Sequence, residues 1–216
     1  MVDYLEKNST VGLIAPLLLD SDMKLSKTLI LAPTILRAFF PMFGKIAYWR
    51  ACARIGMKPL DVEATEGAAV MVRREAMERV GLMDESFFFY GEIVDWCLRF
   101  HKVGYRVQIL PGARMIHCGK GSTKAVGSAS WIELKRSEHQ IYIKWLGFWP
   151  ARFRLLLDVL GIIGKSSFYF ALFVLSLGLW QKSITKAERH ILVLRWILDG
   201  MPDRKAPGYT AKYGVW

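Results

Sequence analysis

Residues 87–99 constrain the fold of this chain more than any other segment. Three consecutive phenylalanines predict burial, and they are followed by Glu92, Asp95 and Arg99 at positions i, i+3 and i+7. On a helix these charged side chains share one face near the N-terminus, where the helix dipole favours acids. The pattern predicts either a well-capped surface helix or a carboxylate presented to a cleft as a general base.

The distribution of charge indicates an anionic partner for the second half of the chain. The 216 residues carry a net charge of +11 and are 53% hydrophobic, enough for one domain or one domain with an appendage. Residues 1–100 hold 12 Lys/Arg and 13 Asp/Glu, whereas residues 101–216 hold 18 and 6. Because the later cations flank apolar runs, an anionic membrane surface fits better than nucleic acid, and we expect no nucleic-acid partner.

Cysteine usage favours a reducing, cytoplasmic setting. The three cysteines, Cys52, Cys97 and Cys118, form no CxxC pair and no disulfide framework. The first residues lack a basic stretch followed by an apolar one, so we expect no signal peptide.

Hydrophobic periodicity and turn residues predict an α/β arrangement followed by helices. In the first part we expect the end of an amphipathic helix at 1–8 with Val2 and Leu5 inward, a buried strand at 11–19 closed by the turn Asp20-Ser21-Asp22, and an irregular basic and aromatic excursion at 33–60. We then expect a strand at 67–72, helices at 73–80 and 92–103, strands at 105–110 and 114–117, a glycine-rich loop, and helices beyond about residue 128.

Residues 151–180 are the candidate membrane segment. The uncharged run at 166–180 falls short of the roughly 20 residues that cross a bilayer, and extending it backward admits Lys165 and Asp158. We favour a helix in the membrane interface or a helical hairpin dipping into it; a true span and a buried soluble helix are the alternatives.

His117 is a candidate metal ligand. A single histidine at the end of a strand more often caps or packs, but here Gly119, Gly121 and Ser122 follow it closely. Such a loop lets backbone approach a phosphate, and imidazole suits a divalent metal such as Mn²⁺.

Several residues in order resemble the family 2 glycosyltransferases, and within them the bacterial rhamnosyltransferase-like group. The pattern is dense over residues 61–123 and consists of Gly67-Ala68, Arg73-Arg74-Glu75, Val80-Gly81, Asp84-Glu85, Phe87-Phe88-Phe89-Tyr90, Glu92, Asp95-Trp96-Cys97, Arg99, Gly104-Tyr105, Pro111 and His117. Residues 11–16 and Pro33-Thr34 resemble the stretch that precedes this pattern in the family.

The resemblance implies a GT-A fold, in which a mixed α/β sheet binds a nucleotide-sugar at one half and the acceptor at the other. We therefore expect residues 1–125 to be the acceptor-side part of a GT-A domain. Residues 126–216 would be a basic, hydrophobic, helical segment associated with the cytoplasmic face of the bacterial inner membrane.

The activity implied is inverting transfer of a sugar from a nucleotide-diphosphate donor, such as dTDP-rhamnose, to a lipid-linked or polysaccharide acceptor in cell-surface glycan synthesis. A carboxylate removes the proton of the acceptor hydroxyl, and a divalent cation, Mn²⁺ or Mg²⁺, offsets the charge of the leaving diphosphate. By resemblance, Glu92 is the expected base with Asp95 as second choice, and His117 is the expected metal ligand. The residues expected to line the acceptor side are Gly67, Ala68, Asp84 and Arg99.

Two departures from the family pattern support a rival interpretation. The acid that commonly follows Glu92 is replaced by Ile93, which instead continues a core stripe with Trp96, Cys97 and Phe100. Asp95 is then better explained as a structural acid paired with Arg99. In addition, the expected nucleotide-binding half with its Asp-x-Asp is absent, and Asp20-Ser21-Asp22 reads as an ordinary turn. The rival is a degenerate transferase that binds a membrane or a partner chain without catalysis.

Overall fold

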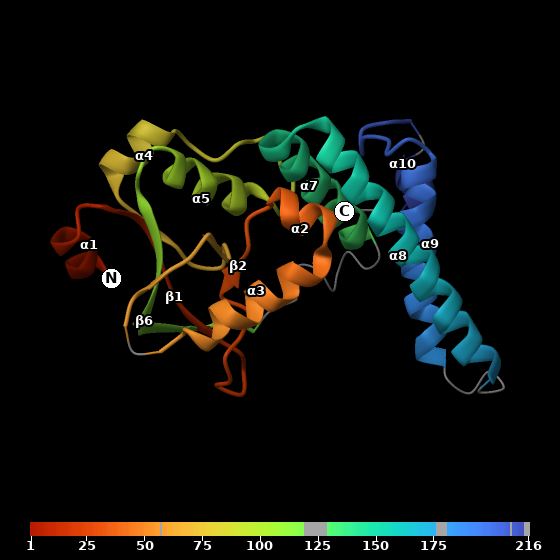
Figure 1. The fold of residues 1–216 in the computed structure, drawn as a ribbon, viewed down its shortest axis with the longest axis horizontal. Coiled ribbons are helices and arrows are strands. Elements are labelled where there is room, and N and C mark those ends of the chain that lie inside the picture. Colours follow the sequence, from red (N-terminus) through yellow and green to blue (C-terminus); the bar gives the residue numbers. More distant parts are fainter. Residues whose placement is uncertain (57, 119–128, 176–180, 208, 214–216) are drawn as a thin grey trace. The chain divides into compact units, whose positions relative to one another are not determined.

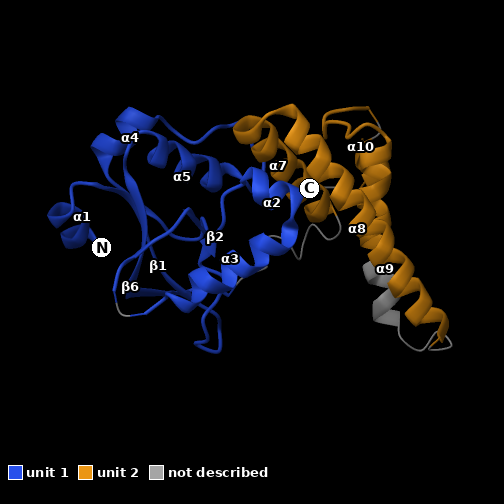
Figure 2. Ribbon diagram, in the orientation of Figure 1, with its two compact units in different colours: residues 1–120 blue, residues 121–216 orange. Residues whose placement is uncertain are grey.

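A computed structural model shows that the chain forms two compact units, residues 1–120 and 121–216 (Figure 2). The structure describes all residues except 57, 119–128, 176–180, 208 and 214–216. The predicted boundary at 125/126 and the glycine-rich loop after His117 therefore lie outside the described residues.

Unit 1 is built on a four-stranded mixed sheet with the order β3-β6-β1-β5 (Figure 1). Its two long strands, β1 and β6, run parallel, and the two short ones pair antiparallel at the edges. The bounds are β1 Val11–Leu19, β3 Leu60–Asp61, β5 Met71–Val72 and β6 Arg106–Ile116. The predicted buried strand at 11–19 is confirmed, because eight of its nine residues are buried.

The strands predicted at 105–110 and 114–117 are one strand in the structure. Pro16 of β1 faces Leu110, whereas the next residue, Leu17, faces Arg114. The three residues between Leu110 and Arg114 therefore form a bulge within β6, and pairing resumes after it. Proline and glycine favour such a bulge because proline cannot donate to the ladder, which is why the sequence alone resembled a strand end.

Helix α5 (Glu92–Lys102) packs against β1, β6 and the short strand β4 (Ala64–Thr65), and it lies beside α4 (Arg74–Val80). The predicted helix at 92–103 is confirmed to within one residue, and Gly104, with φ of 89°, follows its end. The helix at 73–80 is confirmed as well, with Gly81 as its C-cap. At the N-terminus, α1 (Val2–Lys7) buries Leu5 but leaves Val2 54% exposed, so the predicted inward position of Val2 is wrong.

Two other predictions for unit 1 are wrong. Residues 33–60 are largely helical, forming α2 (Ile35–Phe39) and α3 (Pro41–Ala53). Proline at the first position of a helix starts α3 rather than breaking it, and the Thr34 hydroxyl caps α2 by accepting from the Arg37 N–H. The predicted strand at 67–72 is shorter in the structure: residues 67–69 form a turn, and only β5 remains extended. A second, two-stranded sheet pairs β2 (Leu29–Ile30) with β4 (Ala64–Thr65).

Gly12 is needed where β1 passes under α5. A Cβ atom on Gly12 would lie 2.7 Å from Phe100 Cδ1 and 2.8 Å from Tyr105 Cβ. We therefore expect Gly12→Ala to lower the free energy of unfolding by about 1–3 kcal/mol, because a well-packed core resists added volume. Denaturant titration measures the change. Gly112→Ala is the matched control, since its Cβ would meet nothing within 4 Å, and an equal loss in both variants would contradict the packing argument.

Unit 2 is helical, as predicted for the chain beyond residue 128. Its helices are α7 Ala129–Leu146, α8 Phe148–Leu175, α9 Gln181–Leu198 and α10 Tyr209–Tyr213. Its core contains Ile132, Ile162, Val193, Trp196, Tyr209 and Tyr213.

A buried ion pair joins the helices of this unit. Glu133 of α7 has no exposed surface and lies 3.2 Å from Arg136 Nε. The Arg136 guanidinium stacks over the Trp196 ring at 5.0 Å and donates to the Pro202 carbonyl at 2.9 Å. The Tyr209 hydroxyl donates to Glu133 Oε1, which also accepts from Arg136, whereas Oε2 has no hydrogen-bond partner among the described residues and faces Arg136 only as an ion pair.

Helices α8 and α9 lie side by side as a helical hairpin (Figure 1). Among the described helices, α8 alone is long and apolar enough to cross a bilayer, and little of its most apolar stretch is buried. Its 28 residues span about 40 Å. The one acid in it, Asp158, pairs with Lys135 and Arg154. Residues 151–175 belong to one uninterrupted helix, so the hairpin predicted within 151–180 is not seen in the described residues, and membrane association stays a prediction.

Candidate active site

A strained turn sets the start of α5. Tyr90 has a φ of 64° and Gly91 a φ of 87°, so two successive residues adopt the left-handed region. Glycine tolerates this conformation, but tyrosine does so at a cost of about 1–3 kcal/mol. The Tyr90 ring is held edge-on against Phe89, with 4.1 Å between ring centroids. Strain of this kind is found at functional sites, and here it directly precedes Glu92.

Glu92 is the first residue of α5 and carries an unpaired oxygen. Its Oε2 atom is buried and has no hydrogen-bond partner among the described residues. Burying a carboxylate oxygen without a partner costs free energy, although the N-terminal end of the helix dipole offsets part of it. An oxygen in this state is a candidate to accept a proton from a bound hydroxyl group.

A second acid and a tyrosine lie near Glu92. Glu66 precedes Gly67, where an added Cβ would lie 3.5 Å from Ile93 Cβ, and Ile93 follows Glu92 in the chain. Burial and the negative charges of Glu66 and Glu92 raise the pKa of Tyr90. Glu66, Tyr90 and Glu92 therefore lie together at the start of α5.

Sequence reasoning missed two members of this cluster, Glu66 and Tyr90. Glu66 directly precedes Gly67-Ala68, and Tyr90 precedes the N-cap residue Gly91 of the acidic helix, so proximity in sequence was an available signal for both.

The structure brings Gly67 to the N-terminal end of α5. A Cβ on Gly67 would lie 3.5 Å from Ile93 Cβ, and Ala68 is exposed in the same turn. Ile93 itself is 4% exposed and is buried with Trp96, Cys97 and Phe100, so the predicted core stripe is confirmed. The position after Glu92 therefore faces the core.

Asp95 and Arg99 form an internal ion pair. Asp95 has no exposed surface, and its Oδ2 lies 2.9 Å from Arg99 Nε, which confirms the predicted pairing. Arg99 also donates to the Val80 carbonyl at 3.0 Å and thereby ties α5 to the end of α4. This burial favours a structural role for Asp95.

Asp84 lies in the loop between α4 and α5. Its Oδ1 accepts the N–H of Ser86 at 2.9 Å, a local turn that leads into Phe87. This contact shapes the approach to α5, while its predicted place on the acceptor side stays a prediction.

His117 lies just after β6 and is exposed, and its backbone N–H donates to the Leu19 carbonyl at 2.8 Å. The nearby Asp20 side chain accepts the N–H groups of Asp22 and Lys24, which confirms that Asp20-Ser21-Asp22 is a turn. No group of three or more candidate metal ligands occurs in the part of the chain that the structure describes. Residues 119–128, which follow His117 closely, lie outside that part, so the role of His117 as a metal ligand stays a prediction.

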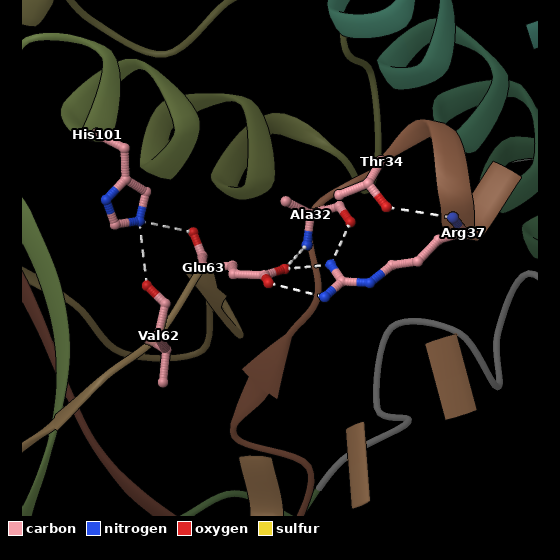
Figure 3. Close-up of polar contacts among 6 residues, drawn as sticks. All are labelled: Ala32, Thr34, Arg37, Val62, Glu63 and His101. Carbon is pink, nitrogen blue, oxygen red and sulfur yellow. Dashed lines mark hydrogen bonds and ion pairs between the residues drawn. The ribbon is translucent and has the colours of Figure 1, made fainter. Parts of the chain in front are cut away.

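A separate pocket of about 430 Å³ lies between α3 and the strands β2 and β3. Its wall is braced by Glu63, which accepts from the Ala32 N–H at 2.7 Å and from Arg37 Nη2 at 2.8 Å (Figure 3). His101 Nε2 lies 3.1 Å from the Val62 carbonyl and 3.0 Å from that of Glu63, so this nitrogen carries the proton.

Comparison with known proteins finds relatives among bacterial rhamnosyltransferases. The chain is 37% identical over 73 residues to the dTDP-rhamnosyl transferase RfbF of Shigella flexneri, an alignment that covers 33% of this chain and 25% of that protein. It is 25% identical over 163 residues to the N-acetylglucosaminyl-diphospho-decaprenol L-rhamnosyltransferase of Mycobacterium tuberculosis, covering 71% of this chain and 53% of the relative. The chain thus spans about half or less of the length of these curated relatives. No family model and no solved structure matches it.

Proposed function

We propose that this chain, a relative of bacterial rhamnosyltransferases, is the acceptor-side part of an inverting glycosyltransferase of family 2 with the GT-A fold. The observation that carries the proposal is the unpaired, buried oxygen of Glu92 beside the strained turn at Tyr90-Gly91. The donor would be dTDP-rhamnose and the acceptor a lipid-linked saccharide, in keeping with the names of the two relatives.

In this proposal Glu92 is the general base. It takes the proton from the acceptor hydroxyl while that oxygen bonds to the anomeric carbon of the sugar. The bond from that carbon to the diphosphate breaks on the opposite face, and its electron pair leaves with the nucleoside diphosphate. Asp95 acts only by holding α5 through Arg99. A divalent cation remains part of the proposal, although the described residues do not provide its ligand set.

The membrane setting also belongs to the proposal. The apolar, exposed surface of α8 would hold the chain at the cytoplasmic face of the inner membrane, where the head of a lipid-linked acceptor emerges. Residues 101–216 contain more Lys and Arg than Asp and Glu, and this excess of positive charge would attract an anionic leaflet and acidic acceptor lipids.

The second candidate is a non-catalytic module that binds a membrane or partner chain. Burial of Ile93 favours it, because the position that commonly holds a second acid in the family cannot move a proton here.

Incubating the chain with Mn²⁺, labelled nucleotide-sugars including dTDP-rhamnose, and a bacterial lipid extract separates the two candidates. The proposal expects label to move into the lipid fraction, with dTDP-rhamnose preferred over the other donors. Binding to liposomes without any transfer or nucleotide-sugar binding would instead support the non-catalytic module.

A further inference from the structure

One segment of unit 1 carries cations without acids. Residues 23–60 contain seven Lys/Arg and no Asp/Glu, whereas the rest of residues 1–120 contains nine Lys/Arg and thirteen Asp/Glu. Residues 23–60 are therefore strongly cationic, while the remainder of unit 1 has a net negative charge. This segment includes α2 and α3.

Helix α3 exposes large apolar side chains to solvent. None of its 13 residues is buried, and Trp49 and Met42 are 72% and 70% exposed. Phe40, which precedes the helix, is exposed as well. A soluble surface rarely carries aromatic and apolar side chains grouped in this way unless something covers them.

The cations on this helix are available to an external anion. Arg37 is neutralised by Glu63, and Lys27 by Glu66. Across the residues that the structure describes, no ion pair involves Lys45, Arg50 or Arg54. Arg50 and Arg54, one helical turn apart, line the 430 Å³ pocket together with apolar residues such as Phe43 and Ile46.

We propose that this face, the α3 surface formed by Phe40, Met42, Lys45, Trp49, Arg50 and Arg54, docks on an anionic phospholipid bilayer. The three cations contact lipid phosphates, while Trp49, Met42 and Phe40 enter the interfacial layer. A second copy of the chain is disfavoured as the occupant because two cationic faces repel each other.

The docking does not require transfer chemistry, so it is independent of the proposed function.

Quenching of tryptophan fluorescence by brominated lipids tests the docking in the full chain. The contribution of Trp49, one of eight tryptophans, is the difference between wild type and Trp49→Phe. We expect this contribution to be quenched in vesicles that contain phosphatidylglycerol and to stay unquenched in pure phosphatidylcholine. Because the readout is specific to position 49, any binding by α8 does not obscure it.

Charge reversal provides the matched control. A triple variant should abolish the quenching of Trp49: it combines Lys45→Glu, Arg50→Glu and Arg54→Glu. Each cation near an anionic surface contributes roughly fivefold to the partitioning of the protein onto the membrane. The equivalent set Lys7→Glu, Arg74→Glu and Lys102→Glu makes the same change in charge at other exposed positions of unit 1 and should leave the quenching of Trp49 intact.

Three results would overturn the docking proposal: no quenching of Trp49, equal quenching in both kinds of vesicle, or a dimer in solution that Trp49→Phe dissociates. Loss of sugar transfer with Trp49 quenching retained would count against the proposed function alone.

Discussion

Glu92→Gln is expected to reduce sugar transfer by about 100-fold or more, because the amide cannot take the proton of the acceptor hydroxyl. Glutamine keeps the shape of the side chain and removes a buried, unpaired charge, so the melting temperature should not fall. The measurement is the initial rate of label transfer to the lipid fraction, with thermal unfolding of the same preparations. Together they separate a chemical defect from a folding defect.

Glu85→Gln is the matched control for this variant. Glu85 lies seven residues before Glu92, in the loop before α5, and is exposed, so the same carboxylate-to-amide change is made outside the candidate site. The Glu85→Gln variant should retain the wild-type rate of sugar transfer. If Glu92→Gln also transferred sugar at the wild-type rate, Glu92 would not be the base.

Arg99→Met is expected to lower the free energy of unfolding by about 3–5 kcal/mol, because it leaves the Asp95 carboxylate buried without its counter-ion. The Val80 carbonyl would lose its donor as well. Urea titration followed by circular dichroism measures the loss. So large an effect identifies Asp95 and Arg99 as a pair that holds α5 in place.

Two further variants sharpen this test. Arg106→Met breaks an exposed pair with Asp61, in which both side chains are about half exposed, and should cost less than about 1 kcal/mol. The double variant Asp95→Leu/Arg99→Met removes both charges and should recover part of the stability lost in Arg99→Met. A small loss in Arg99→Met, similar to that in Arg106→Met, would argue against a structural role for the pair.

The elements predicted correctly are those whose signal is local. An uninterrupted apolar run between polar turns specifies a strand buried on both faces, as in β1. The stripe of Ile93, Trp96, Cys97 and Phe100 together with Gly104 specifies both the inward face and the end of α5. The long helices of unit 2 follow from the same periodicity.

The elements predicted wrongly depend on pairing or lack a period. Strands of two residues, such as β3 and β5, form because β6 and β1 offer them open edges, and no sequence pattern marks them. Helix α3 has no apolar stripe at helical spacing, because cations and small residues interrupt its apolar side chains. The bulge in β6 resembled a break because only the register with β1 shows that the ladder continues.

The sequence was sufficient to predict the pairing of Asp95 with Arg99 and the inward direction of Ile93, since both follow from spacing along one helix; the choice of Glu92 as the base stays a prediction. The tertiary structure was needed to show that Glu92 has an unpaired oxygen, that Asp95 is fully buried, and that Glu66 lies within electrostatic reach of Tyr90. Helical periodicity determines which side chains share a face, whereas burial and contacts between distant segments arise only when the sheet, α3 and α5 pack together.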